Sequence, residues 1–427
     1  MSASTRRLRI RSWYFLALRR GFSAGLVCMS ATGLLVALLV AKLTALQAVT
    51  SVRGRKTRQE DVAHLHLGEV QVGNNALQLY RDGHTLYDAM LTAIDGARES
   101  IYLEASIWRD DEVGRAFKRH LVQKAAEGIA VYVMCAGSGK SIAPRAFRSS
   151  PTNVHILGQR LFPRPWYVLD PRRYALDHRK LLVVDGVVGF IGGYNLGSRY
   201  ATGWRDTHLR IRGQAAAELA HAFIDYWNQY SVPHERITRR YPRQFDPLIV
   251  VRANDALRLT FPIRDMYIEA IGRAEQTILL TNASFVPDRS VLDALKAAVE
   301  RGVDVRVLVP WPSRQSITNR VTCGAFTQCL QAGIRLFGYR PAILRAKTCM
   351  IDGQWSTIGS AHLDLLSSVV NYECNVEIYD ASIASQMQEL FACDTAGAVE
   401  LSLARWMNRP WYIKLSERLL APLRFLL

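Results

Sequence analysis

Two stretches of the sequence place residues that can do acid–base and nucleophilic chemistry at the same intervals. The first is LDHRKLLVVDGVVGFIGGYN, which begins at position 176, and the second is ILRAKTCMIDGQWSTIGSAH, which begins at position 343. A shift of 167 residues superimposes Lys180 on Lys347 and Asp185 on Asp352. One motif therefore occurs twice in the chain.

The two copies differ at the positions whose side chains are best suited to chemistry. The same shift places His178 opposite Arg345 and Asn195 opposite His362. An imidazole, with a pKa near 6.5, can attack phosphorus or carry a proton at neutral pH. A guanidinium stays protonated, so it stabilises anionic charge but does not usefully donate a proton.

These residue types fit the transfer of a phosphodiester without a metal. Lysines neutralise the non-bridging phosphate oxygens. Displacement through a covalent intermediate needs a nucleophile and an acid that protonates the departing alkoxide, and two histidines, one from each half, would supply both. The other histidines lack metal-ligand spacing and the seven cysteines contain no CxxC pair, so we expect neither a metal site nor a cofactor.

The motif residues precede apolar runs that predict β-hairpins. Each run contains an Asp-Gly pair, at Asp185-Gly186 and Asp352-Gly353, which is a favoured hairpin turn. His178 and Lys180 are two residues apart, so on a strand their side chains share one face.

The repetition extends beyond the motif. AIDGARESIYLEASIW, from position 93, is echoed by AIGRAEQTILLTNASF, from position 270, and a helix–glycine–strand pattern follows each. Strand–helix–strand alternation predicts an α/β fold of two pseudo-symmetric halves, each a mixed, mostly parallel sheet flanked by helices. If the halves pack about a pseudo-dyad, both motifs meet at one cleft.

The N-terminal region predicts a membrane anchor. Residues 21–41 contain no charged side chain and are long enough to cross a hydrocarbon core as a helix. The length of this run, and the lack of a clean A-x-A site after it, favour a transmembrane helix over a cleaved signal peptide. Basic residues flank the run on both sides, which leaves the orientation open.

We therefore divide the chain into six segments. They are a basic N-terminal segment (1–20), a transmembrane anchor (21–48), a first half (70–230), a linker (231–255), a second half (256–400) and an amphipathic C-terminal segment (401–427). The last mixes tryptophans and leucines with basic residues, which fits a helix on the membrane surface or one docked on the protein itself.

The net charge of +17 indicates an anionic partner but does not show which kind of anion it is. Such a charge attracts polyanions, whether nucleic acid, an anionic membrane surface or phosphorylated substrates. The hydrophobic content of 49% and charged content of 21% exclude a largely disordered chain.

The first motif resembles the signature of the phospholipase D superfamily, HxKxxxxD followed by a Gly-Gly or Gly-Ser pair and Asn. From about Leu77 to the tail, segments such as IWRDDEVG, WRDTHLRI, WSTIGSAHLD and NYECNVEIYD are similar to the bacterial cardiolipin synthases within it. The resemblance implies two phospholipase D-like halves that share one phosphate site.

The resemblance also implies a role for each matching residue. His178 would be the nucleophile that forms a phosphohistidine. Asp206, 28 residues later, would orient its imidazole, and Glu373 has the same spacing from Arg345. The candidate catalytic residues are His178, Lys180, Asp185, Lys347, Asp352 and His362, of which the two aspartates are expected to be structural, at the turns. The candidate phosphate ligands are Lys180, Asn195, Lys347, Ser360 and Arg345.

The second motif departs from the family pattern, which has histidine at Arg345 and asparagine at His362. Three interpretations stay open: His362 takes over as the acid, Arg345 ion-pairs with Glu373 in a weak or inactive relative, or the altered half serves another phosphodiester. Serines also stand at Ser106 and Ser284, where the synthases tend to have tyrosine.

The sequence thus predicts a membrane-bound phosphatidyltransferase that uses a phosphatidylglycerol-like donor and an alcohol acceptor. The alternatives are a degenerate lipid-binding relative, a hydrolytic phospholipase D, or a nuclease, against which the anchor counts. We expect an anionic phospholipid, not nucleic acid, as the partner, and the bacterial inner membrane as the location, with a single N-terminal anchor. The side of the catalytic part and the oligomeric state stay open.

Overall fold

The computed structural model describes residues 65, 67–135, 153–158, 175–238, 241–243, 245–311, 317–411 and 414–415, with the backbone alone at 317–322. The predicted basic segment and transmembrane anchor lie outside these residues. Among the residues that are described, no helix combines the length and the apolar character needed to span a membrane. The chain divides into two units, Met1–Arg58 and Gln59–Leu427, and the fold below belongs to the second.

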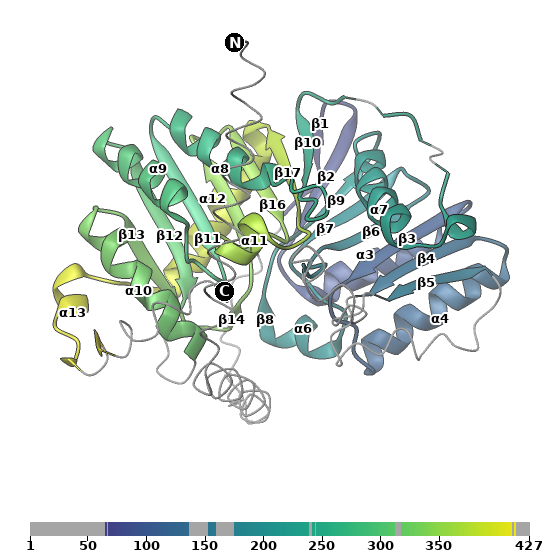
Figure 1. Cartoon of the computed structure of the whole chain (residues 1–427), viewed down its shortest axis with the longest axis horizontal. Coiled ribbons are helices and arrows are strands. Elements are labelled where there is room, and N and C mark those ends of the chain that lie inside the picture. Colours follow the sequence, from purple (N-terminus) through teal and green to yellow (C-terminus); the bar gives the residue numbers. More distant parts are fainter. Residues whose placement is uncertain are drawn as a thin grey trace, which may run out of the picture. The chain divides into compact units, whose positions relative to one another are not determined.

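Two eight-stranded sheets form this unit (Figure 1). The first has the order β1 (Val70–Val72), β2 (Asn75–Tyr80), β9 (His208–Arg212), β7 (Val188–Gly192), β6 (Lys180–Val184), β3 (Ser100–Ala105), β4 (Ala130–Cys135), β5 (Val154–Gly158). The second has the order β10 (Ile249–Ala253), β17 (Cys374–Tyr379), β16 (Trp355–Gly359), β15 (Lys347–Ile351), β11 (Thr277–Asn282), β12 (Asp304–Pro310), β13 (Arg335–Tyr339), β18 (Ala398–Glu400).

The two orders repeat each other. Strands β9-β7-β6-β3-β4-β5 of the first sheet correspond to β17-β16-β15-β11-β12-β13 of the second. The motif hairpins β6–β7 and β15–β16 occupy equivalent places at the centre of each sheet. The internal repeat expected from the sequence is therefore a repeat of the fold. Strand β10 lies in the segment assigned to the linker and pairs with β17.

The prediction of mostly parallel sheets was wrong. Among the described strands, five of the seven pairings in the first sheet and five of the seven in the second are antiparallel. Within the two sheets, the described strands have parallel neighbours at β3–β4–β5 and β11–β12–β13. A hairpin with a tight turn joins antiparallel strands, and the strands after each hairpin, β9 and β17, extend that arrangement.

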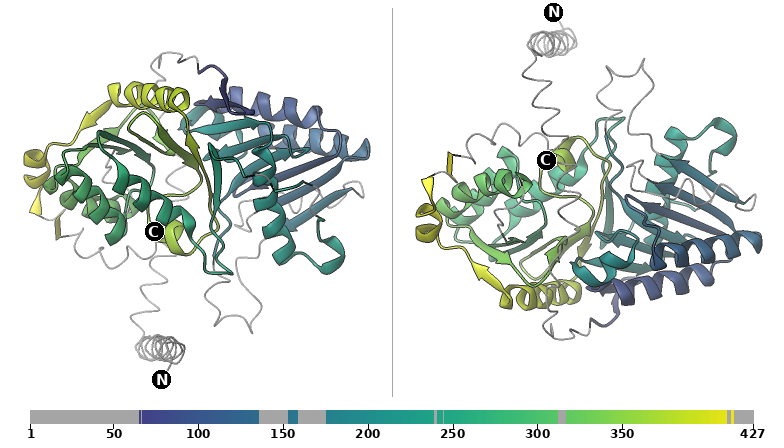
Figure 2. Two further views of the ribbon diagram at one scale, coloured as in Figure 1. Left: turned by 90° about the horizontal axis from the view of Figure 1, so that it is seen from above. Right: turned by 90° about the horizontal axis from the view of Figure 1, so that it is seen from below.

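Helices cover both faces of each sheet (Figure 2). In β6, Leu182 and Val184 pack with α3 (Gly83–Asp95) and α4 (Glu112–Ala126), whereas Leu181 and Val183 face α7 (Ala216–Tyr230). This alternation is the period of two expected of a strand that is buried on both faces. The second sheet packs α8 (Pro262–Arg273), α9 (Arg289–Glu300) and α10 (Ile317–Gln331) on one face and α12 (Ala381–Ala396) on the other.

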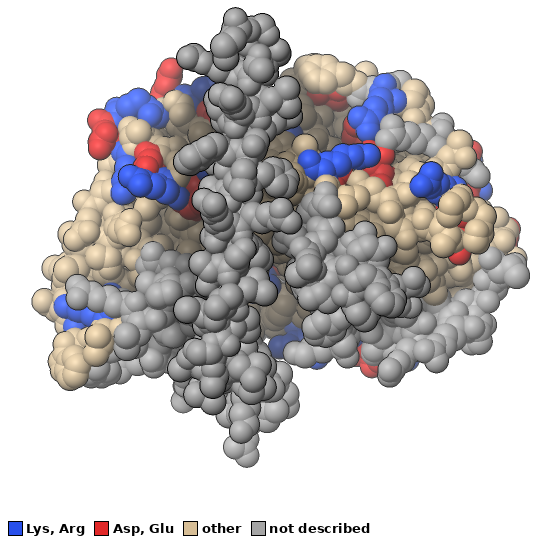
Figure 3. Space-filling model, in the orientation of Figure 1, with Lys and Arg blue, Asp and Glu red and all other residues tan. Residues whose placement is uncertain are grey.

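Charged side chains of both signs intermingle on the face shown in Figure 3. On α8 and α9, Arg273 lies 3.4 Å from Glu269, and Arg289 lies 3.6 Å from Asp293. Some of the basic residues drawn on this face therefore lie beside acidic neighbours.

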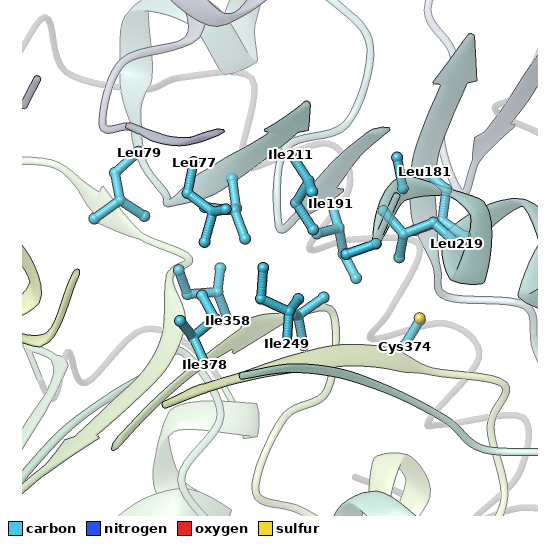
Figure 4. Close-up of a cluster of buried hydrophobic side chains, with 14 of the residues drawn as sticks. Leu77, Leu79, Leu181, Ile191, Ile211, Leu219, Ile249, Ile358, Cys374 and Ile378 are labelled. Atoms are coloured by element: carbon cyan, nitrogen blue, oxygen red, sulfur yellow. The ribbon is translucent and has the colours of Figure 1, made fainter. Parts of the chain in front are cut away.

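An apolar core joins the two sheets. Figure 4 shows side chains of the first sheet, including Leu77, Ile191 and Ile211, across from Ile249, Ile358 and Ile378 of the second. All six are buried. The halves therefore share a core, and the ends of their central hairpins are held at one place.

Short elements connect the halves at the motif end. Strand β8 (Trp204–Arg205) pairs in parallel with β14 (Ile343–Leu344), and Asp177 forms an isolated bridge with Tyr372. Helices α6 (Ser198–Gly203) and α11 (Leu365–Val369) follow the two motifs. The remaining short elements are η3 (Pro233–Glu235) and α13 (Leu403–Met407).

Candidate active site

The two motifs meet because each is bonded to the backbone of the opposite half. The N–H of His178 donates to the carbonyl oxygen of Tyr372 at 3.0 Å, and the N–H of Arg345 donates to that of Arg205 at 2.8 Å. Strands β6 and β15 start two residues after these positions. The two motifs therefore meet between the halves, as expected from a pseudo-dyad, and the place where His178 and Arg345 and the residues after them meet is named the cleft.

The imidazole of His178 is held by a carboxylate of the second half. Its Nδ1 lies 3.0 and 3.2 Å from the two carboxylate oxygens of Glu373, which is fully buried. A carboxylate accepts, so Nδ1 carries the proton and the lone pair lies on Nε2. The side chain of His178 is 25% exposed, so it can be reached from the cleft.

This geometry corrects the expectation that Asp206 orients His178. Asp206 instead lies near the second motif, with its Oδ2 3.8 Å from Nζ of Lys347. Both carboxylates stand 28 residues after the first residue of their own motif. The halves face each other, so each carboxylate reaches across to the opposite motif, which a spacing along the chain cannot reveal.

Two hydroxyls complete the environment of Glu373. Ser360 Oγ donates to one carboxylate oxygen, and Ser367 Oγ donates to the other at 2.8 Å. Burial raises the pKa of Glu373, but the charge and hydrogen bond of His178, with help from Lys180 and Ser360, outweigh it and lower the pKa. Ser360 was expected to donate to a phosphate, and the structure turns its hydroxyl to Glu373 instead.

Two buried lysines line the cleft. Lys180 donates from Nζ to the carbonyl oxygen of His178 and to Ser106 Oγ at 3.3 Å, and Lys347 donates to the carbonyl oxygen of Arg345. Burial, followed by the charge of Lys347, lowers the pKa of Lys180 to about 7. Burial, in part offset by Asp206, lowers the pKa of Lys347 to about 8. An anion between them would relieve this repulsion.

His362 reaches the cleft from the position where the family has asparagine. Its ring stacks on that of His178, with centroids 5.5 Å apart and planes at 29°. Burial, together with the charges of Lys347 and Arg345, holds the pKa of His362 well below its usual value. The two imidazoles therefore lie against each other, and the lowered pKa favours the neutral form of His362.

Arg345 occupies the other altered position. Its guanidinium carbon lies 5.1 Å from the centre of the Trp204 ring, a cation–π contact with the first half. Burial lowers the pKa of Arg345, and the charge of Asp206 opposes that shift. Within the described residues it makes no ion pair with Glu373, so that part of the second interpretation was wrong.

Several buried polar atoms at this place have no hydrogen-bond partner in the described part of the chain. They are Asn195 Oδ1, Asp206 Oδ2, His208 Nε2, Arg345 Nε and His362 Nδ1. Most buried polar groups in proteins are hydrogen-bonded, so a group of orphaned atoms indicates a site that receives a polar ligand.

The first glycine of each Gly-Gly or Gly-Ser pair has no room for a side chain, because neighbouring atoms pack directly against it. A Cβ on Gly192 would lie 2.4 Å from the carbonyl oxygen of Thr207, and one on Gly359, its counterpart in the second motif, would lie 2.1 Å from Asn375 Oδ1. No side chain fits at such distances, which explains why the family signature has glycine there.

The two motif aspartates lie at the hairpin turns, away from the cleft. Asp185 has a φ of 53° and accepts from the backbone N–H groups of Arg98, Glu99 and Ser100 at 2.8–2.9 Å. Asp352, with a φ of 52°, accepts from Glu275, Gln276 and Thr277 at 2.7–2.8 Å. These contacts fit the structural role that we expected, and not a catalytic one.

Sequence reasoning missed two residues of the site. Buried His208 accepts from the N–H of Tyr194 at 3.4 Å, and burial, with the charges of Lys180 and Lys347, lowers its pKa to about 3. Ser367 reaches Glu373 from α11. His208 lies inside the family-like segment WRDTHLRI and could have been noticed there, whereas no spacing indicates Ser367. Within the described residues, no group of three or more His, Cys, Asp or Glu side chains is arranged to hold a metal.

Comparisons with known proteins agree with this arrangement. A family profile described as "Cardiolipin synthase, PLD-like domain" matches residues 267–395. The chain is 30% identical over 386 residues to a cardiolipin synthase of Listeria monocytogenes, covering 86% of this chain and 80% of that protein. The chain belongs to the cardiolipin synthase family of phospholipase D-like proteins. It is also 33% identical over 347 residues to cardiolipin synthase A of Pseudomonas putida, covering 78% and 71%.

Solved structures support the fold of this family member. Phosphatidylserine synthase of Haemophilus influenzae aligns with a TM-score of 0.62 at 14% identity, covering 86% of this chain and 97% of that one. Polyphosphate kinase of Porphyromonas gingivalis aligns with a TM-score of 0.52 at 15% identity, covering 82% and 53%. At these identities the likeness shows the fold alone.

Proposed function

We propose that this protein is a membrane-bound phosphatidyltransferase of cardiolipin synthase type. It transfers a phosphatidyl group from a phosphatidylglycerol-like lipid to an alcohol, such as a glycerol hydroxyl of a second lipid. The observation that carries the proposal is the pair of stacked imidazoles, His178 and His362, beside two buried lysines, with His178 bonded to Glu373.

In the first step, Nε2 of His178 attacks phosphorus and forms a P–N bond, and the bond from phosphorus to the leaving glycerol oxygen breaks. Glu373 stabilises the imidazolium that results. Lys180, Lys347 and Arg345 offset the charge that gathers on the phosphate oxygens. The leaving alkoxide takes a proton.

His362 is the proposed source of that proton. In the free protein burial and neighbouring cations keep it neutral, but a bound phosphate anion favours its charged form. In the second step the acceptor hydroxyl returns a proton to His362 and attacks phosphorus, and the P–N bond breaks. With water as the acceptor the same steps give hydrolysis.

A second candidate is a lipid-binding relative with little activity. The contact of Arg345 with Trp204 favours it, because a guanidinium there cannot act as the acid. Loss of a general acid lowers turnover by roughly 10²–10⁴-fold.

Lipid analysis of bacteria that lack their own cardiolipin synthases separates these candidates. The cells are complemented with wild type, His178→Ala, His362→Ala and Arg345→His, and the level of each protein in the membrane is measured. We expect cardiolipin from wild type and none from His178→Ala or His362→Ala. No cardiolipin from wild type, but cardiolipin from Arg345→His, supports the second candidate and contradicts the first.

The proposed location is the bacterial inner membrane, with residues 21–48 as a single anchor. This rests on the apolar run in the sequence and on an anionic lipid substrate that suits a chain of net charge +17. Extraction of membranes with alkaline carbonate tests it: the protein stays with the lipid if the anchor is present, and a variant that begins after residue 48 is released.

A further inference from the structure

A cavity of about 560 Å³ opens on the second half, between α9, α10 and α11. Its volume lies in the range of small-molecule sites, roughly 300–1,000 Å³. The residues that line it are Val286, Pro287, Asp288, Arg289, Leu292, Asp293, Lys296, Ala325, Gln328 and Leu365.

The cavity is lined by buried apolar residues and by charged residues that are paired. Val286, Leu292 and Ala325 are buried, and Asp288 pairs with Arg264 outside the lining. Asp293 lies between Arg289 and Lys296, at 3.6 and 3.8 Å. The apolar residues therefore suit a hydrocarbon, and the charged residues suit a polar surface.

The cavity lies next to the proposed active site. The N–H of Val286 donates to the carbonyl oxygen of Leu363, the residue after His362, at 2.8 Å. Leu365, which lines the cavity, is three residues from His362, or at most about 10 Å along the chain. Leu365 and Val369 leave 36% and 39% of their surface exposed, one turn apart on α11.

We propose that this cavity receives one acyl chain of the phospholipid whose phosphate lies between His178 and His362. The proposal rests on the proposed function and adds the place of the lipid tail. An acyl chain attached to a phosphate in the cleft must leave the cleft along some surface. Packing that chain against Val286, Leu292 and Ala325 of the cavity would remove it from water. Blocking the cavity should therefore weaken lipid binding, and the loss of affinity should grow with the number of methylene groups that are no longer buried.

Photo-crosslinking with the full-length protein tests this assignment. The protein in detergent micelles is given a phosphatidylglycerol that carries a diazirine at the end of one acyl chain, and labelled peptides are mapped by mass spectrometry. We expect adducts at 286–296, 325–328 and 365–369. Adducts confined to other peptides would overturn the proposal.

Two variants block the cavity in different ways. Leu365→Glu places a charge at its mouth, and Ala325→Trp fills its apolar part. Val187→Glu, an exposed residue in the turn after β6, is the matched control, and thermal melting verifies the fold of all three. We expect about tenfold less labelling of the cavity peptides in both blocking variants and no change in the control. Equal labelling of wild type and of whichever blocking variant folds would also overturn the proposal.

Kinetics give an independent readout. With dipalmitoyl phosphatidylglycerol, both blocking variants should lose about tenfold in kcat/KM, while dihexanoyl phosphatidylglycerol should be used within about twofold of wild type. Labelling does not require turnover. If the protein is inactive but adducts form in the cavity, the acyl-chain site is supported and the proposed function is contradicted. If the protein is active but adducts form elsewhere, only the acyl-chain site is contradicted.

Discussion

The imidazole of His178 depends on a carboxylate from the other half of the chain. Glu373 is fully buried and accepts from three donors, His178, Ser360 and Ser367. Such a carboxylate fixes the tautomer that leaves Nε2 free to attack, and it stabilises the imidazolium that forms.

Glu373→Gln should therefore slow chemistry more than binding. We expect kcat to fall by roughly 10²–10⁴-fold with KM changed little, because the neutral amide neither stabilises the imidazolium nor enforces the tautomer. The measurement is steady-state transfer by the purified protein. Glu377→Gln is the control, since Glu377 is a buried carboxylate on β17, the strand that begins directly after Glu373, and it bonds Arg252 and Trp355 instead. Equal kcat values for Glu373→Gln and wild type would contradict the assignment.

The pH dependence of kcat/KM should be bell-shaped. Burial lowers the pKa of His178 below 6.5, so the nucleophile is neutral from near neutrality upward and activity rises with pH on the acid side. Lys180 and Lys347, with pKa values of about 7 and about 8, are charged below those values and lose their charge above them. Since the protonated lysines hold the phosphate, kcat/KM should fall as pH rises through 7–8.

This profile is measured from pH 5 to 10 at constant ionic strength. A bound anion raises the lysine pKa values, so the basic limb of kcat should lie at higher pH than that of kcat/KM. A kcat/KM that stays level up to pH 10 would mean that neither lysine holds the phosphate.

The sequence predicted which residues lie at the site better than it predicted which of them are hydrogen-bonded to each other. Lys180 and Lys347 lie together because the repeat places them at equivalent strand starts. His178 stands just before one of these strands, and His362 follows β16, the partner of the other. The partner of His178 could not be read from the sequence, since Asp206 and Glu373 have the same spacing and only the packing of the halves decides between them. Their catalytic roles stay predictions.

At the scale of elements, the motif aspartates hold each hairpin to the preceding strand. Asp185→Ala should lower the free energy of unfolding by roughly 1–3 kcal/mol, since three backbone N–H groups lose an acceptor and alanine is strained at a φ of 53°. Asp352→Ala should act alike in the second half. Thermal melting of the full chain in detergent measures both.

Asparagine is the control for these variants. Asp185→Asn keeps one side-chain oxygen as an acceptor and tolerates a positive φ, so it should cost less than Asp185→Ala. Both should keep the kcat of the folded fraction, because the turn lies at the far end of β6 from Lys180, about 17 Å away by strand rise. A large loss of kcat without loss of stability would return Asp185 to the catalytic set.

The turns of the two hairpins follow from the sequence pattern, but the directions of the strands around them do not. The hairpin turns were predictable because Asp-Gly has a specific backbone preference. The parallel or antiparallel direction of every strand in the sheet was not predictable, because a crossover helix fixes only the relative direction of the two strands that it joins. It does not constrain the strands that follow the hairpin. β10 falls within the predicted linker because its run, Ile249–Ala253, is short and lies beside proline-bearing polar sequence.

At the scale of the whole molecule, the site exists only where the two halves are joined. Glu373 and His178 come from different halves, and the core that holds them includes Ile191 and Ile211 on one sheet and Ile358 and Ile378 on the other. A substitution in that core should therefore destabilise both halves and the site between them.

Ile358→Ala tests this coupling. Ile358 is fully buried against the first sheet, and its truncation should cost about 2–5 kcal/mol and leave a cavity. Hydrogen exchange followed by mass spectrometry should show faster exchange in β7 and β9 of the first half as well as in β16. Ile271→Ala is the matched control, because Ile271 is equally buried but packs within the second half alone. If Ile358→Ala accelerates exchange only in the second half, as Ile271→Ala should, then the halves fold as independent units, and the bond from Glu373 to His178 is made by docking two finished bodies.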